Sequence, residues 1–484
     1  MALTVIITGK PSAGKTTLLT RCVDIFGATG TTGVLCPSGN SGEIRHSSAD
    51  RYYMRSPASP KKHLWAERLP GEVPPDFSRE MKPNYRFYPT VREKMEARVR
   101  SRLERGDLLC WLLDDIGPLE LAGEGWAPLL HRRDTFHVGI LILVVKKRLL
   151  PEIVSTFSLE DHLLIDLDHV SPAEAIPRVE HLHHELETRR VGEYAGMCGT
   201  MEIGLGSLLH GLRIPFKGHF LALLQNAMLI LAGNSMGGRG LFRVTCITAM
   251  LKSFSPMHNP LRPMISIALQ GSLFSTITMI TRWRLFGVLL ASILMGWLTI
   301  GLGLLFQYML FGHAFVLMMA GFLGAAGRLL GVTLSPLGAL LWLLGVRAAI
   351  SIVVALVAWY GHLSGLLMAI EERWTPMKPR LSPLTENSWG RSALLALRDL
   401  LRPWFVLFLA LSGLLLFVFS PLDPRAGALV FARGALLAFV FFTLQHRVPL
   451  SRLLAVVQRR GGENMGRAMA IAVKKVSSRA GSDK

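Results

Sequence analysis

The chain has 484 residues, 50% of them hydrophobic, so it is too long for one domain and more apolar than a soluble protein of this size usually is. Its 53 Lys and Arg residues outnumber its 34 Asp and Glu residues, which gives a net charge of +19. Residues 1–200 carry 26 charges of each sign, whereas residues 201–484 carry 27 basic and 8 acidic residues. Ile203 to Ile370 contain no acidic residue. We therefore expect a soluble part followed by a membrane part, with lipid and not nucleic acid as the partner of the excess charge.

The five cysteines are scattered and include no CxxC pair, which favours reduced thiols over a disulfide framework or a zinc site. We expect no signal peptide, because residues 1–8 already belong to the first strand. The soluble part is therefore expected to lie in the cytoplasm.

A strand, a glycine-bracketed loop and a helix are the first predicted elements. Leu3 to Ile7 is an apolar, β-branched run, residues 9–16 match GxxxxGK[ST], and a helical pattern runs from Leu18 to about Gly27. This is a P-loop in the context that the motif requires. Backbone N–H groups of such a loop, and the dipole of the helix after it, favour phosphate. The predicted nucleotide-binding residues are Gly9, Lys10, Pro11, Ser12, Ala13, Gly14, Lys15, Thr16 and Thr17.

Two of these side chains are expected to take part in the chemistry. Lys15 would reach the β- and γ-phosphates and act in catalysis, and the Thr16 hydroxyl would bind Mg²⁺.

A second buried strand follows a charged helix that a capping box opens at Thr90 and Glu93 and that ends at Gly106. The strand, Leu108 to Leu113, leads directly into Asp114 and Asp115. An apolar strand with a carboxylate at its end is the layout of a Walker B motif, so we expect Asp114 to bind Mg²⁺ and Asp115 to orient the attacking water. Two aspartates after a strand also serve as helix caps, which is the alternative.

Two further strands are predicted, at residues 138–145 and 162–167. The first ends in a basic cluster from which Lys147 or Arg148 is expected to stabilise γ-phosphate charge, the alternative being a solvated turn. The second precedes a helix that starts at Ser171. On that helix His181 and Glu185 share a face, which we interpret as a polar surface and not a metal site.

Together the ITGKPSAGKTT and LLCWLLDDIGPLEL stretches and the basic strand end resemble the small RecA-like P-loop nucleoside-triphosphatases over about residues 1–190. The resemblance implies an α/β domain with a mostly parallel sheet, and Mg²⁺-dependent hydrolysis of ATP, GTP and other nucleotides. That family usually has Asp-Glu at positions 114–115, so the shorter Asp115 implies slow turnover. Glu120 also matches the family pattern and is expected to share the catalytic role. No LSGGQ-type signature occurs in residues 1–190, which argues against an ABC-transporter ATPase.

The rest of the chain is predicted to be an all-α polytopic membrane domain with eight spans. A short linker (191–202) leads to six transmembrane helices (203–370), a basic cytoplasmic loop (371–402), two further helices (403–445) and a basic cytoplasmic tail (446–484). We expect a multi-pass protein of the cell inner membrane, with the nucleotide-binding domain and the C-terminus cytoplasmic.

Polar groups within the predicted spans are the candidates for a solute site, because ionisable side chains are costly in hydrocarbon. Arg328 and Arg347 have no acidic partner in residues 203–370. These two arginines are expected to bind an anion, snorkel or interact with helix C-termini. Further candidates for a solute site are His210, His219, Gln225, Asn226, Gln270 and Gln307. For each of these, simple helix–helix hydrogen bonding is the alternative.

The run from Gly204 to His219, with Ser255-Pro256 and Pro263 to Gly271, resembles the six-helix solute-binding (S) components of energy-coupling-factor transporters, over residues 203–368. It implies a small solute, such as a vitamin, a metal or an anion, and other transporter subunits. Transporters of that type use ABC-class ATPases, which this chain lacks. The sequence therefore predicts a membrane-bound nucleoside triphosphatase coupled to or regulating solute transport, with a membrane-anchored NTPase or a nucleotide-dependent signalling protein as alternatives.

Overall fold

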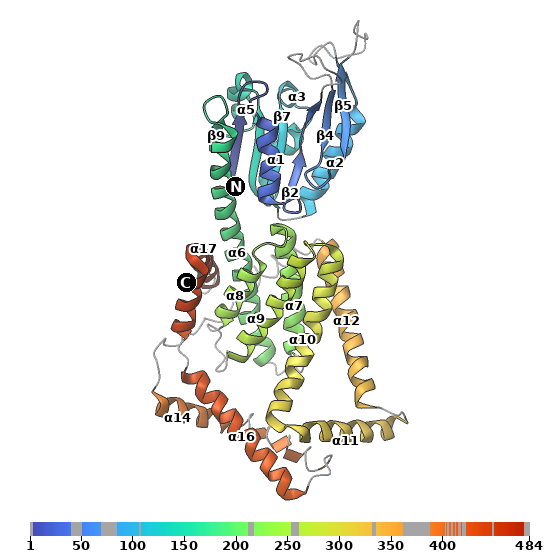
Figure 1. Ribbon diagram of the computed structural model, residues 1–484, viewed down its shortest axis with the longest axis vertical. Coiled ribbons are helices and arrows are strands. Elements are labelled where there is room, and N and C mark those ends of the chain that lie inside the picture. The colour runs from blue at the N-terminus through green and yellow to red at the C-terminus, as the bar shows by residue number, and fades with distance from the viewer. Residues whose placement is uncertain are drawn as a thin grey trace. The chain divides into compact units, whose positions relative to one another are not determined.

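The computed structural model describes residues 3–39, 51–68, 85–105, 108–211, 217–252, 261–331, 335–361, 388–401, 423–447 and 450–478, with single residues between 403 and 418. Figure 1 shows an α/β part followed by a helical part. The contacts divide the chain into two compact units, the first built mainly from Met1–Arg190 and the second including Val191–Ile230 and Leu241–Gly361.

A five-stranded parallel sheet is the centre of the first unit. Its strands are β1 (Leu3–Thr8), β2 (Thr31–Val34), β7 (Leu108–Ile116), β8 (Val138–Val145) and β9 (His162–Asp166). The order across the sheet is β2-β7-β8-β1-β9, and every pairing is parallel. The expected α/β fold with a mostly parallel sheet is confirmed.

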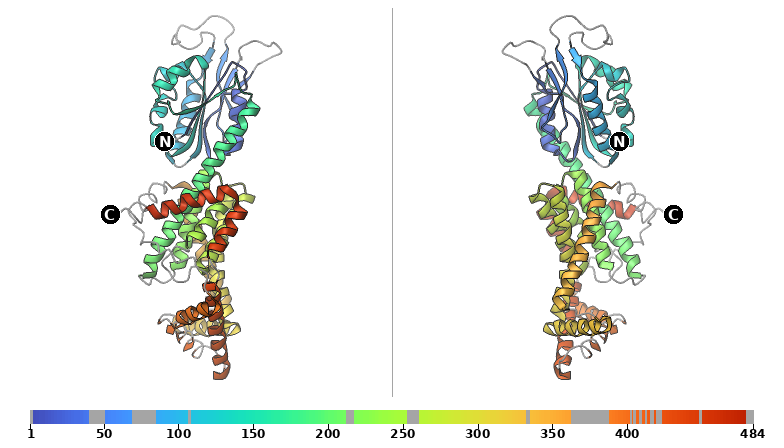
Figure 2. Two further views of the ribbon diagram at one scale, coloured as in Figure 1. Left: turned by 90° about the vertical axis from the view of Figure 1, so that its left-hand side faces the viewer. Right: turned by 90° about the vertical axis from the view of Figure 1, so that its right-hand side faces the viewer.

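Helices cover both faces of this sheet (Figure 2), which explains why its strands are continuous apolar runs and not alternating ones. Val5, Ile6 and Ile7 of β1 are completely buried. On one face lies α1 (Lys15–Phe26), whose Phe26 packs edge-on against His183 of α6 (Pro172–Gly211). The other helices of this unit are α2 (Pro89–Arg105), α3 (Pro118–Leu121), α4 (Ala127–His131) and α5 (Leu150–Thr156).

A smaller antiparallel sheet belongs to the same unit. It has the order β3-β4-β5-β6 and contains β3 (Ser38–Gly39), β4 (Arg51–Arg55), β5 (Lys62–Arg68) and β6 (Tyr85–Phe87). An isolated bridge from Leu35 to Arg55 connects it to the chain that leaves β2.

Helices make up most of the described residues of the second unit. They are α7 (Lys217–Met236), α8 (Leu241–Leu251), α9 (Leu261–Ile280), α10 (Leu285–Phe311), α11 (His313–Leu330), α12 (Pro336–Tyr360), α14 (Trp389–Leu400), α16 (Pro424–Arg447) and α17 (Leu450–Ser478). Among the described residues, four helices are long and apolar enough to cross a membrane: Pro263–Ile280, Leu285–Phe311, Pro336–Tyr360 and Arg425–Thr443. The protein thus has membrane-spanning candidates, and α10 packs against both α9 and α12.

The structure differs from the prediction in two segments of the second unit. Residues 191–202, expected as a linker, are helical because they belong to α6, and much of the expected tail forms α17. Residues 371–387 of the predicted loop 371–402, and most of residues 404–420 where the first of the two further helices was predicted, lie outside the described residues. The domain limits and the count of eight spans stay predictions.

Candidate nucleotide and metal site

The loop between β1 and α1 has the backbone that its glycines allow. Gly9 has a φ of 145° and Gly14 a φ of 89°, and Ser12 between them also takes a positive φ of 64°. A Cβ added at Gly9 would come within 3.1 Å of Leu167 Cβ, and one at Gly14 within 3.0 Å of Pro172 Cγ. Both positions therefore require glycine for conformation and for space.

Lys15 folds back over this loop. Its Nζ donates to the carbonyl oxygens of Gly9 at 2.8 Å and Lys10 at 2.6 Å. Partial burial lowers the pKa of Lys15, while the carboxylates of Asp114, Asp115 and Asp168 act in the opposite direction. The ammonium group is thus held at the mouth of the loop, where a phosphate chain would lie.

Thr16 and Asp114 meet although 98 residues separate them. The Thr16 hydroxyl donates to Asp114 Oδ2 at 3.0 Å, and the backbone N–H of Cys36 donates to the same oxygen at 3.0 Å. Asp114 is only 4% exposed, and burial raises its pKa to about 6 although these hydrogen bonds favour the charged form. The two predicted metal ligands therefore lie side by side.

These two groups fit a hard divalent cation. Such cations prefer carboxylate and hydroxyl oxygens, and a buried carboxylate with a raised pKa gains stability from a nearby positive charge. Thr16 and Asp114 would hold the ion together with phosphate oxygens, and the ion would neutralise charge on the phosphates.

Asp115 and Glu120 occupy different environments. Asp115 takes a left-handed φ of 61° where the pairing of β7 with β8 shifts register, and its exposed carboxylate lies 3.6 Å from Lys146 Nζ. Glu120 is 4% exposed and accepts hydrogen bonds from the backbone N–H groups of Gly117 at 2.8 Å and Trp126 at 3.4 Å. Burial raises the pKa of Glu120. Asp115 thus presents an exposed carboxylate beside Lys146, whereas Glu120 holds the turn after Asp115.

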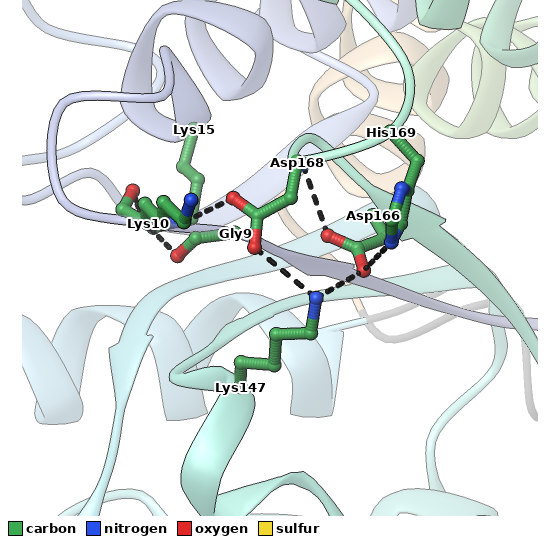
Figure 3. Close-up of polar contacts among 7 residues, drawn as sticks. All are labelled: Gly9, Lys10, Lys15, Lys147, Asp166, Asp168 and His169. Carbon is green, nitrogen blue, oxygen red and sulfur yellow. Dashed lines mark hydrogen bonds and ion pairs between the residues drawn. The ribbon is translucent and has the colours of Figure 1, made fainter.

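Sequence analysis did not assign a second pair of carboxylates, which Figure 3 shows beside the loop. Asp168 Oδ1 accepts from the backbone N–H of Lys10 at 2.7 Å. Lys147 Nζ donates to Asp166 Oδ2 at 2.8 Å and to Asp168 Oδ2 at 3.1 Å. The Asp-Leu-Asp sequence at the end of β9 was the available signal, because carboxyl ends of parallel strands meet at one edge of a sheet.

The two lysines at the end of β8, Lys146 and Lys147, contact different carboxylates. Lys147 is engaged by Asp166 and Asp168, while Lys146 contacts Asp115 and lowers the pKa of Lys15 by its charge. Since β8 lies between β1 and β7, Lys146 emerges between the loop and the aspartate pair. Lys146 is therefore the residue of this cluster that contacts the aspartate pair, whereas Lys147 or Arg148 was predicted to stabilise γ-phosphate charge.

The parallel sheet, the loop and the aspartates near the end of β7 give the first unit the architecture of a P-loop α/β domain. No protein-family model matches the chain, and no curated protein matches it. Among solved structures, the chain is similar to THEP1 from the hyperthermophile Aquifex aeolicus, with 19% identity, a TM-score of 0.28, and coverage of 37% of this chain and 96% of that one. It is also similar to a human cancer-related nucleoside triphosphatase, with 20% identity, a TM-score of 0.27, and coverage of 34% of this chain and 88% of that one.

Proposed function

We propose that the first unit is a Mg²⁺-dependent nucleoside triphosphatase that hydrolyses ATP or GTP slowly. The observation that carries this proposal is the 3.0 Å contact between Thr16 Oγ1 and Asp114 Oδ2. Lys15, the residue before Thr16, folds back over the loop and donates to the Lys10 carbonyl. A loop that only bound an anion would not need a buried carboxylate beside its hydroxyl, since that carboxylate repels phosphate in the absence of a cation.

The residues have separate roles in this proposal. The loop amides and Lys15 hold the β- and γ-phosphates, and Thr16 and Asp114 hold the metal ion, which neutralises phosphate charge. Asp115 orients the attacking water, and Lys146 stabilises the charge that develops on the γ-phosphate oxygens. Glu120 is assigned to the same catalytic group from its sequence pattern, and its hydrogen bonds to Gly117 and Trp126 would fix the turn that carries Asp115.

Hydrolysis is tested on the purified whole chain in lipid nanodiscs. Lys15→Ala and Asp114→Asn should each abolish steady-state turnover, whereas Lys62→Ala, an exposed lysine on β5, should not. Unchanged turnover in either site variant would remove this site from the reaction. A single-turnover assay separates an enzyme from a nucleotide-binding switch, because a switch binds the nucleotide without cleaving it.

The roles of Asp115 and Glu120 are distinguished by measuring both turnover and stability for a variant of each residue. Asp115→Asn should lower kcat by about 10²-fold or more without changing stability, as expected for a residue that acts on the attacking water. Glu120→Gln should lower stability by about 1–3 kcal/mol, because a buried backbone donor loses its charged acceptor. If Glu120→Gln also reduces kcat in protein that is fully folded, Glu120 shares the catalytic role.

We further propose that hydrolysis is coupled to passage or binding of a small solute in the second unit. The four candidate spans among the described residues exceed what an anchor requires. Buried polar groups lie on these spans, such as Arg347, or on α7 beside them, such as Gln225 and Asn226. The proposed setting is the cell inner membrane, with other transporter subunits as partners and with the S-component likeness as the model for the solute site. An anchored NTPase or a signalling protein is the competing function.

Reconstitution in liposomes distinguishes these functions. If the two units are coupled, a solute from a panel of vitamins, metals and anions should alter the NTPase rate of the whole protein or be taken up. If the panel changes neither rate nor uptake, and deletion of residues 203–370 leaves turnover as it was, the membrane part is an anchor.

A further inference from the structure

Three side chains of the kinds that bind transition metals meet on the part of α6 that belongs to the first unit. They are His183, His184 and Glu187, and their ligand atoms all lie within 4.8 Å of one another. At 3.6 residues per turn, the three positions fall within a sector of about 100° of the helix. The neighbouring residues His181 and Glu185 are not part of this group, because they form a separate exposed pair 3.5 Å apart.

Two of the three ligands are held in the packed interior of the first unit. His183 is 5% exposed and Glu187 is 7% exposed. The His183 ring packs edge-on against Phe26, with the ring centroids 5.1 Å apart, and lies 5.6 Å from the ring of His184. Packing restricts the rotamers of the two buried side chains, whereas the exposed His184 side chain can turn toward them. The group therefore combines two fixed ligands with a third that adjusts.

The donor atoms suit a divalent ion of the zinc class. Zn²⁺ binds imidazole nitrogen and carboxylate oxygen at about 2.0–2.2 Å, and two histidines with one glutamate hold it with a fourth position open. Tetrahedral ligand atoms then lie about 3.4 Å apart, so separations within 4.8 Å must shorten by at most about 1.4 Å. Rotation of the His184 ring supplies such a movement. Mg²⁺ suits this group poorly, because it prefers oxygen ligands.

The group lies far from the nucleotide site. Phe26, which the His183 ring contacts, is the last residue of α1, and the phosphate loop precedes the first residue of that helix. A helix of 12 residues is about 18 Å long. On the same stretch of α6, Leu186 Cδ2 lies 3.4 Å from the place of a Cβ at Gly139, near the start of β8. The three ligands are therefore at the amino-terminal edge of the sheet, opposite the edge that carries the aspartates and the loop.

We propose that His183, His184 and Glu187 bind one transition-metal ion of the zinc class, through one imidazole nitrogen of each histidine and the carboxylate of the glutamate. The ion crosslinks one turn of α6 and, through the His183 ring, holds that helix against the end of α1. Its fourth position is open to water or to an external ligand, because His184 lies at the surface. This ion is distinct from the Mg²⁺ of the proposed hydrolysis, and its binding does not depend on that activity.

Metal binding is measured on the whole chain in lipid nanodiscs, without an affinity tag and in the Asp114→Asn background, so that the nucleotide site lacks its carboxylate. The protein is stripped with a chelator and titrated with Zn²⁺ against a fluorescent zinc indicator, in excess Mg²⁺ and without nucleotide. This parent should bind one Zn²⁺ that Mg²⁺ does not displace. Glu187→Gln, which keeps the size of the side chain, and His184→Gln, at the exposed position, should each weaken Zn²⁺ binding by at least about tenfold, since even hydrogen-bond partners of metal ligands contribute that much.

His181→Gln and Glu185→Gln are the matched controls, because this exposed pair has the same spacing on the same helix as His183 and Glu187. Both controls should bind Zn²⁺ as the parent does. Co²⁺ in place of Zn²⁺ should give the visible absorption of a four- or five-coordinate ion, and His184→Gln should lose that absorption.

Hydrogen exchange separates loss of the ligand from misfolding. Zn²⁺ should slow the exchange of peptides that contain residues 179–190 in the parent and in both controls, but not in His184→Gln, whose metal-free exchange should match that of the parent. The proposal is overturned if the parent binds no Zn²⁺ in excess Mg²⁺, if Glu187→Gln and His184→Gln bind as tightly as the parent, or if the controls weaken binding equally. Because no readout here is turnover, failure of the proposed NTPase activity would leave these results as they are.

Discussion

Asp114 should reduce the stability of the nucleotide-free protein while it serves metal binding. Burial raises the pKa of Asp114 from an ordinary value of 3.8 to about 6. At 1.36 kcal/mol per pKa unit, this rise means that the charged carboxylate destabilises the folded first unit by about 3 kcal/mol near pH 7.5. The folded state binds the proton more tightly than the unfolded state, so the stability is complete at low pH and is lost as pH rises from about 4 to about 6.

Asp114→Asn should therefore stabilise the nucleotide-free protein. The asparagine oxygen can still accept from Thr16 Oγ1 and from the Cys36 N–H, so the variant removes the charge and keeps these two contacts. Hydrogen exchange of the β1 and β7 peptides, measured by mass spectrometry on the whole chain without nucleotide or metal, should slow by about 10²-fold at pH 7.5. The free-energy difference between the variant and the parent, calculated from these exchange rates, should shrink several-fold by pH 4.

Asp115→Asn is the control, because that carboxylate is exposed. Equal exchange rates for Asp114→Asn and the parent at pH 7.5 would refute the reasoning, since the carboxylate would then carry no cost in the folded state. An exchange-rate difference between Asp114→Asn and the parent that stays the same at pH 4 would also refute the reasoning, because protonation of Asp114 would then not account for it.

Three other outcomes follow from the same structure. Mg²⁺ affinity, measured by titration in the presence of nucleotide, should fall about tenfold per pH unit below the Asp114 pKa of about 6, because the proton and the cation compete for that carboxylate. A Mg²⁺ affinity that stays constant down to pH 5 would contradict this. Lys147→Met should weaken nucleotide binding about three- to fivefold, because two carboxylates beside the loop lose their cation, whereas Arg148→Met should not, and the reverse order would reassign the cation. Reporter fusions at Ser47 and at Lys484 should both report the cytoplasmic side, and an external C-terminus would change the number of spans by an odd count.

The sequence determined the parts of the site that are local in the chain. The loop from Gly9 to Thr16 is specified by residues within one short stretch, because positive φ angles and close approach select glycine at two positions. The apolar run of β7 likewise places Asp114 near the C-terminal end of a strand, which extends to Ile116, whatever the order of the sheet. For these reasons the strand, the loop, the helix and the aspartate pair were predicted where the structure has them.

Only the tertiary structure decided which of these pieces meet. The insertion of β8 between β1 and β7 brings Lys146, and not its neighbours, toward Asp115, and the pairing of β1 with β9 brings Asp168 to the Lys10 amide. Adjacent lysines look alike in a sequence, and their directions depend on a strand order that no short pattern encodes. In the helical unit the sequence marked Arg347 as an unpaired charge, because paired carboxylates were absent. The packing of α10 against α12 decided that its buried Nε faces a glycine and a serine, since contacts between residues far apart in the chain are fixed by packing and not by local propensity.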